Sequence, residues 1–234
     1  MSSGILYGVG LGPGDPELMT LKAARLIAGA GCIAYPTLAG ADSFARAIAA
    51  AVIAPGTEEI RMDLPMTRDR APAQTAYDAG AARIAEVLEQ GRDVVCLCEG
   101  DPLFYGSFMY VMARLADRFR VEVVPGVASV TACAARARVP LVARNERLEV
   151  LPATLDAAEL EARIAQADAV AVMKLGRNLP KVRDILDRMG LTARAVYVER
   201  ATLPDEVVTP LAEAPGAAPY FSMILVTKGN DPWL

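Results

Sequence analysis

The sequence contains no histidine at all. Histidine is the usual general base at neutral pH and the commonest protein ligand for transition metals. Its absence disfavours a histidine-based acid–base mechanism and a transition-metal centre. We therefore expect no bound metal, and a reaction that depends on other groups or mainly on the positioning of the reactants.

Cysteine is scarce, and its distribution gives no sign of a disulfide frame or a zinc site. Disulfide frameworks and zinc sites both show characteristic close cysteine spacings, which this chain lacks. We predict buried, reduced thiols instead. The four positions lie inside apolar runs: Cys32, Cys96, Cys98 and Cys133.

Long apolar segments and an excess of basic residues are also missing. The longest stretch without charge, Leu26 to Ala41, is shorter than the roughly 18 residues of a membrane span and contains glycine and proline. The first ten residues lack the basic start of a signal peptide. A net charge of −4 disfavours a nucleic-acid partner. We expect a cytoplasmic protein that binds neither membrane nor nucleic acid.

Short apolar runs rich in valine or isoleucine are abundant. In the first half they begin near residues 5, 32, 58, 93 and 121 and alternate with helical patterns, which is typical of parallel βαβ units. From about residue 126, runs near 148, 169, 194 and 223 are accompanied by helical patterns only around 156–166 and 179–188. The sequence thus predicts an α/β protein of two domains. Residues 1–125 form a parallel five-stranded sheet with helices on both faces, and residues 126–234 form a mixed sheet with helices.

Two Asp-Pro pairs suggest helix starts after strands. Asp15 with Pro16 predicts the cap and first turn of a helix that runs to about residue 30. Asp101 with Pro102 predicts the same for a helix whose apolar stripe comprises Phe108, Val111, Met112 and Leu115. A third turn, PGV, follows the run near 121. Such turns lie at the carboxyl ends of parallel strands, where α/β sheets bind ligands.

The first of these turns, GVGLGPGD, does not match a dinucleotide fingerprint. In the pattern G-x-G-x-x-G the third glycine would fall on Pro13 or Asp15. A nicotinamide-dependent reductase is therefore a weak alternative. A purely structural tight turn is another interpretation of the same glycines.

Four segments together resemble the tetrapyrrole methylase family of S-adenosylmethionine-dependent enzymes. They are YGVGLGPGDPEL at 7–18, CEGDPLFYGSFMY at 98–110, VVPGVASVTACAA at 123–135 and AVMKLGRNL at 171–179. The resemblance covers nearly the whole chain. Within the family, the second segment, RMDLPM at 61–66 and the pair Tyr35-Pro36 are most similar to members that methylate C-20 of precorrin-2 in cobalamin biosynthesis. A cobalt-containing substrate of the anaerobic branch is the nearest alternative.

The resemblance implies a two-domain protein, a homodimer, that holds S-adenosylmethionine largely through backbone groups and apolar walls. Siroheme-type members have an aspartate, proposed as a base, where this chain has Pro36, so the proton acceptor is left unnamed. Glu99, beside the second segment, is a candidate, alongside a structural role for that carboxylate and proton transfer to water. The cofactor positions carried over by motif are Pro13, Gly100, Asp101, Leu103, Phe104, Ala128, Ser129, Met173 and Ala201.

The substrate of such enzymes is a small-molecule tetrapyrrole rich in carboxylates, which a chain of negative net charge must bind through local positive fields. Our hypothesis is that two or three basic residues grip its acetate and propionate groups. A non-catalytic tetrapyrrole carrier would use the same residues. The candidates are Arg61, Arg68, Arg70, Arg144, Arg147, Lys174 and Arg177.

Overall fold

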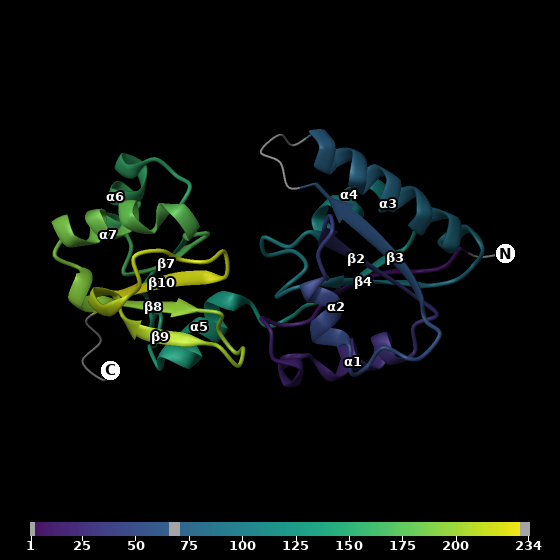
Figure 1. The fold of residues 1–234 in the computed structure, drawn as a ribbon, viewed down its shortest axis with the longest axis horizontal. Helices are drawn as coiled ribbons and strands as arrows, with labels where there is room; N and C mark the ends of the chain where they lie inside the picture. The colour runs from purple at the N-terminus through teal and green to yellow at the C-terminus, as the bar shows by residue number, and fades with distance from the viewer. Residues whose placement is uncertain (1–2, 66–70, 230–234) are drawn as a thin grey trace. The chain divides into compact units, whose positions relative to one another are not determined.

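The computed structural model describes residues 3–65 and 71–229. The chain divides into two compact units, Met1–Ala128 and Ser129–Leu234, and each contains one five-stranded sheet (Figure 1). The predicted fold class, a parallel sheet followed by a mixed sheet, is confirmed. In the part of the chain that the structure describes, no helix is both long and apolar enough to cross a membrane.

All neighbouring strands of the first sheet run parallel, in the order β3-β2-β4-β1-β5. The last residues of the two central strands, Gly10 and Cys98, are paired in register. From here the chain leaves β1 toward β2 and leaves β4 toward β5, in opposite directions. This reversal is the switch point where α/β sheets bind ligands. The strands are β1 Leu6–Gly10, β2 Cys32–Leu38, β3 Glu58–Leu64, β4 Val94–Cys98 and β5 Val121–Val124.

Helices cover both faces of this sheet, as predicted (Figure 1). Side chains alternate along β4: Val95 and Leu97 pack with α1 and α2, whereas Cys96 packs with α3 and α4. The fully apolar sequence of β4 follows from this burial on two sides. The four cysteines are buried and free, which confirms their predicted state. The helices are α1 Leu21–Ala28, α2 Phe44–Ala49, α3 Ala71–Glu89 and α4 Phe108–Leu115.

The predicted start of the first helix is wrong. Asp15 caps only a short 3₁₀ turn, η1 Pro16–Leu18, by accepting a hydrogen bond from the N–H of Glu17 at 2.9 Å. The α-helix begins at Leu21, where the hydroxyl of Thr20 accepts from a backbone N–H and acts as the cap. The 3₁₀ turn ends because Met19 and Thr20 are extended, with ψ values of 141° and 149°.

The predicted start of the fourth helix is also wrong. Ser107 occupies the N-cap position of α4, and Asp101 and Pro102 belong to the loop before it. Aspartate followed by proline initiates tight turns as readily as helices, so the pair alone could not distinguish the two. The predicted apolar stripe from Phe108 to Leu115 does lie on α4.

The second sheet has the order β6-β7-β10-β8-β9, with β6 and β7 parallel and the other pairs antiparallel. Because β10 runs against β7 and β8, its first residues lie beside the last residues of those two strands: Met223 pairs with Met173, and Ser222 with Glu199. The exposed edge strand β9 was not among the predicted runs. The strands are β6 Leu148–Pro152, β7 Ala169–Met173, β8 Ala195–Glu199, β9 Val207–Pro210 and β10 Ser222–Thr227.

Helices cover both faces of the second sheet as well. The two predicted helices are present as α6 Ala157–Gln166 and α7 Leu179–Arg188, and they pack together on one face. The helix α5 Ser129–Ala137 packs on the other face through Val130 and Cys133. A separate short 3₁₀ turn, η2 Gly176–Asn178, connects β7 to α7.

Candidate functional site

Three loops meet at the carboxyl edge of the first sheet: residues 11–15 after β1, 99–107 after β4 and 125–128 after β5. Backbone hydrogen bonds extend the pairing of β1 and β4 beyond the strands. The N–H of Leu11 donates to the carbonyl of Cys98 at 3.0 Å, and Gly12 and Gly100 exchange two bonds of 3.2 and 2.8 Å. The first two loops are therefore fixed to each other through their main chains.

The third loop joins them through a contact that only glycine allows. A Cβ atom on Gly10 would lie 2.5 Å from the nitrogen of Gly126 and 2.7 Å from the carbonyl oxygen of Gly100. A Cβ atom on Gly126 would lie 2.1 Å from that same oxygen. All three distances are far shorter than real Cβ contacts, so the backbones touch directly. We call Gly10, Gly100 and Gly126 the glycine junction.

The Asp101 carboxylate connects two of the loops across the glycine junction. Its Oδ1 atom accepts from the N–H of Leu103 at 2.9 Å, and its Oδ2 atom accepts from the N–H of Gly126 at 3.0 Å. Both oxygens are thus engaged by backbone donors. The Asp101 side chain therefore fixes the shape of the two loops.

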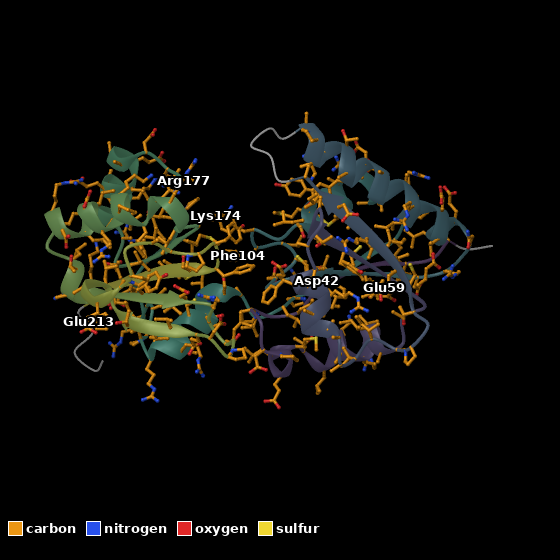
Figure 2. All side chains as sticks on the ribbon, viewed as in Figure 1. Asp42, Glu59, Phe104, Lys174, Arg177 and Glu213 are labelled. Carbon is orange, nitrogen blue, oxygen red and sulfur yellow. The ribbon has the colours of Figure 1, made fainter. Side chains whose placement is uncertain are left out.

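Apolar side chains project from the loop after β4. Leu103 is 47% exposed and Phe104 39%, and Phe104 packs edge-on against Tyr105 with ring centroids 5.2 Å apart. The Phe104 side chain stands out from the ribbon in Figure 2. Exposed apolar side chains beside polar backbone groups are more typical of a ligand-binding site than of the rest of a protein surface. Within the first unit the structure brings together Pro13, Gly100, Asp101, Leu103, Phe104 and Ala128 around this edge.

The cofactor positions expected in the second unit also gather at one edge of their sheet. Met173 ends β7, and Ala201 follows the end of β8 by two residues; both pack against the cluster that contains Val130 of α5. Ser129 is the first residue of that helix. These three positions were predicted from widely separated segments, and the second unit places them around one apolar cluster.

Backbone strain accompanies the ends of these two strands. Lys174, Arg200 and Thr202 have positive φ values of 59°, 48° and 72° although none is glycine. Such residues cost about 1–3 kcal/mol each and persist only where the surroundings hold them. The surrounding structure therefore holds the turns after β7 and β8 in conformations that their own residues do not favour.

Among the candidate substrate-binding residues, Lys174 and Arg177 lie where β7 ends, as Figure 2 shows. Arg147 lies before β6, where its guanidinium contacts Asp168 at 3.6 Å. The strands β6 and β7 are parallel, so Arg147 is at the opposite edge from Met173, about 17 Å away for a five-residue strand. The structure does not bring Arg147 to the site.

The remaining basic candidates occupy separate places. Arg61, on β3, forms an ion pair with Asp63 at 2.7 Å and donates to the carbonyl of Ala41 at 2.9 Å. Arg144 is exposed in the segment between α5 and β6, with a φ of 47°. Arg68 and Arg70 lie outside the described residues.

Glu99 is half-buried at the end of β4, directly before the glycine junction. Burial raises the pKa of its carboxyl group, and a hydrogen bond with the backbone of Ala45, in the first turn of α2, partly offsets this effect. Among the carboxyl groups of residues 3–65 and 71–229, Glu99 is the one whose pKa is raised. The pKa values of Glu59 and Asp168 are lowered. The position supports both a proton-accepting and a structural role, and no catalytic residue is assigned.

Sequence reasoning missed the reason for a glycine within β1. A Cβ atom on Gly8 would lie 2.3 to 2.5 Å from three ring atoms of Phe108, so this glycine lets α4 approach the sheet closely. The available signal was the glycine pair at alternate positions 8 and 10 of a strand, which indicates a close approach on one face. Among the described residues no group of three or more acidic or cysteine side chains could hold a metal ion.

Comparison with known proteins identifies the family of the chain. A sequence model described as tetrapyrrole (corrin/porphyrin) methylases matches residues 5–215. The chain is 44% identical to a precorrin-2 C(20)-methyltransferase of Sinorhizobium sp and 32% identical to the cobalt-precorrin-2 C(20)-methyltransferase of Salmonella typhimurium; each comparison covers 97% of both chains.

Solved structures agree with these relatives. A cobalt precorrin-4 methyltransferase superimposes with a TM-score of 0.71 at 26% identity, covering 95% of this chain and 94% of the other. A uroporphyrin-III C-methyltransferase of Thermus thermophilus, complexed with S-adenosylhomocysteine, gives a TM-score of 0.67 at 27% identity, with coverage of 96% and 92%.

Proposed function

Because the chain belongs to the tetrapyrrole methylase family, we propose that it transfers the methyl group of S-adenosylmethionine to C-20 of precorrin-2, giving precorrin-3A and S-adenosylhomocysteine, in cobalamin biosynthesis. It is an S-adenosylmethionine-dependent C-methyltransferase. The structural observation that supports the proposal is the glycine junction, where the main chains of three loops meet directly at the carboxyl edge of a parallel sheet.

The residues at the two edges suit S-adenosylmethionine. A ligand with an adenosine, an amino-acid group and an apolar methyl requires backbone donors and acceptors together with apolar walls. The loops of the first unit offer main chain at Gly100 and apolar side chains at Leu103 and Phe104. The second unit offers the Met173 side chain and the small residue Ala201. We propose that these positions, with Pro13, Asp101, Ala128 and Ser129, hold the cofactor.

The chemistry fits a chain without histidine. S-adenosylmethionine supplies an activated methyl group, and a meso carbon of a partly reduced tetrapyrrole is an enamine carbon that is already nucleophilic. The work left to the protein is to hold both in line, which can lower the barrier by about 7–11 kcal/mol. The rigid main-chain junction is suited to this task because it has no flexible side chain to reorder.

The substrate carboxylates require cations, and we propose that Lys174 and Arg177 bind them. Lys174 directly follows Met173 at the end of β7, and Arg177 lies in η2. Planar guanidinium groups match carboxylates well, and the ammonium group acts as a point charge. Charge reversal at each residue should weaken tetrapyrrole binding and leave the affinity for S-adenosylhomocysteine unchanged.

We favour the metal-free substrate over the cobalt-containing one. The chain is 44% identical to the precorrin-2 C(20)-methyltransferase and 32% identical to the cobalt-precorrin-2 C(20)-methyltransferase. An assay that measures release of S-adenosylhomocysteine, run once with metal-free and once with cobalt-loaded precorrin-2, distinguishes the two. Calorimetric titration with S-adenosylhomocysteine and with NADH tests the donor. Binding of NADH alone would indicate a reductase, and tetrapyrrole binding without methyl release would indicate a carrier.

We also propose that the protein acts as a cytoplasmic homodimer. Exposed apolar residues support association: Val207 and Val208 lie on the edge strand β9, and Tyr220 and Phe221 lie before β10. Sedimentation equilibrium measures the assembly directly, and a mass of a single 24.8 kDa chain at micromolar concentration would refute it.

A further inference from the structure

The turn after β8 is held in a conformation that its sequence does not favour. The chain passes through Arg200, Ala201 and Thr202, and the two residues that flank Ala201 have positive φ values. Glycine would adopt such values without strain, yet no glycine is present in the turn. The surrounding side chains must therefore impose this backbone.

Arg200 is held from two sides. Its guanidinium group pairs with the carboxylate of Glu199 and, at 2.8 Å, with Asp205. Glu199 is buried, and its second oxygen accepts a 2.6 Å hydrogen bond from the hydroxyl of Tyr197, which is also buried. A buried carboxylate is tolerated only with such partners. The Arg200 Nε atom is the one buried side-chain nitrogen or oxygen without a partner in the described part of the chain.

Thr202 is held by a second carboxylate. Its N–H donates to Glu206 at 2.6 Å, and both oxygens of Glu206 lie 2.8 Å from the Nε atom of Arg136. Arg136 belongs to α5, the helix that begins with Ser129. This contact joins the Ala201 turn to α5 across 70 residues of sequence.

Stabilisation alone does not account for this arrangement. The ion pair between Arg200 and Asp205 is exposed and contributes little to the free energy of unfolding. Glycines at positions 200 and 202 would allow the same backbone without charged partners. What the charged groups add is a fixed backbone at Ala201 and a fixed connection to the helix of Ser129. Both positions belong to the proposed cofactor site.

We propose that Glu199, Arg200 and Glu206 are positioning residues for S-adenosylmethionine. They hold the main chain of Ala201 in its binding conformation and in register with Ser129 before the cofactor arrives. A preformed site avoids the entropic cost of ordering the turn on binding. This inference rests on the proposed function, because it requires the cofactor to contact Ala201.

The test compares variants that keep the fold and release the turn. In Arg200→Gly the backbone can adopt the same φ, but both ion pairs are lost. We expect a lower melting temperature, because the buried Glu199 carboxylate loses its cation. Well below that temperature, the affinity for S-adenosylhomocysteine should be about tenfold lower, because the turn must then be ordered on binding. The KM for S-adenosylmethionine should rise by a similar factor, whereas kcat at saturating cofactor stays constant.

Two further variants and a control complete the test. Arg200→Lys keeps a cation between Glu199 and Asp205 and should recover most of the affinity. Glu206→Gln keeps an acceptor for Thr202 but loses the charge pair with Arg136, so binding should weaken. The control Glu161→Gln removes the exposed pair between Arg188 and Glu161, 2.7 Å apart and distant in sequence from the turn, and should change nothing.

The outcomes distinguish a failure of the proposed function from a failure of the positioning role. If the unchanged protein does not bind S-adenosylhomocysteine, the proposed function fails. If it binds and Arg200→Gly binds equally well, the positioning role is wrong and the proposed function stands. If Arg200→Lys restores thermal stability but not the affinity for S-adenosylhomocysteine, the positioning role is also wrong.

Discussion

The backbone N–H of Gly126 donates to the Oδ2 atom of Asp101 at 3.0 Å, while the Oδ1 atom of the same carboxylate accepts from Leu103. One side chain therefore connects the loop after β4 to the loop after β5. An aspartate that the motif marks as a cofactor residue is, in this fold, the group that holds the loops after β4 and β5 together.

Replacing Asp101 by asparagine should loosen this connection. An amide has one acceptor oxygen, and its NH₂ group would face a backbone donor, leaving one N–H unpaired at a cost of about 1–3 kcal/mol. We expect a loss of stability of this size and weaker binding of S-adenosylhomocysteine. Thermal unfolding and calorimetry measure the two effects. Asp78→Asn, at an exposed ion pair of the same unit, is the control; equal effects in both variants would contradict the proposed role.

Replacing Gly8 by alanine should push α4 away from the sheet. The added methyl group would overlap the ring of Phe108, and overpacking of a core costs about 1–3 kcal/mol. Gly31→Ala is the matched control, because a Cβ atom there meets nothing within 4 Å. Denaturant unfolding should show a clear loss for Gly8→Ala and none for Gly31→Ala. The double variant with Phe108→Leu should lose less than the sum of the single variants.

The pH dependence of stability should report on Glu99. Burial raises the pKa of its carboxyl group in the folded state above the ordinary value of 4.5. The folded state therefore holds a proton that the unfolded state has released, and stability from this group is lost as the pH rises from the unfolded to the folded pKa. Compared with the unchanged protein, Glu99→Gln should become relatively more stable across that interval and show no further change above it. Urea unfolding at a series of pH values measures the difference, and a difference that is constant with pH would refute the burial effect.

The cysteines should be unreactive in the folded protein. Burial raises the pKa of Cys32 to about 11 and that of Cys133 to about 12, and it also raises the pKa of Cys96 and Cys98. Because the thiolate is the reactive form, a disulfide reagent at pH 8 should modify none of them until the protein unfolds. Spectrophotometric titration should count no reactive thiol without guanidinium and four with it. Fast modification of one thiol in the folded state would show that it is accessible.

Most helices and strands of this fold could be predicted because the spacing of apolar residues is a local property of the sequence. The apolar run of β4 and the periodic stripe of α4 both indicated their structures correctly. The starts of α1 and α4 could not be predicted, since Asp15 and Asp101 occur in sequences that suit a turn or a helix equally. The strand β9, short and exposed, offers no alternating pattern to detect.

The site was predictable only as a set of loops. Motifs identified the segments after β1, β4, β5, β7 and β8, but their internal contacts join residues distant in sequence. The bond between Asp101 and Gly126 spans 25 residues, and that between Arg136 and Glu206 spans 70. No local pattern encodes such pairs. The glycine junction likewise follows from where three strands end in the sheet, which depends on the strand order.

The glycine junction also bears on how such an enzyme can change over evolutionary time. Main chains packed directly against one another keep the same arrangement whatever amino acids surround them, provided that the three glycines remain. Under the proposed function, mutations that reshape the acceptor side can then accumulate while the methyl donor is bound as before. A single scaffold of this kind can thus diversify toward new macrocycles without having to reinvent its source of methyl groups.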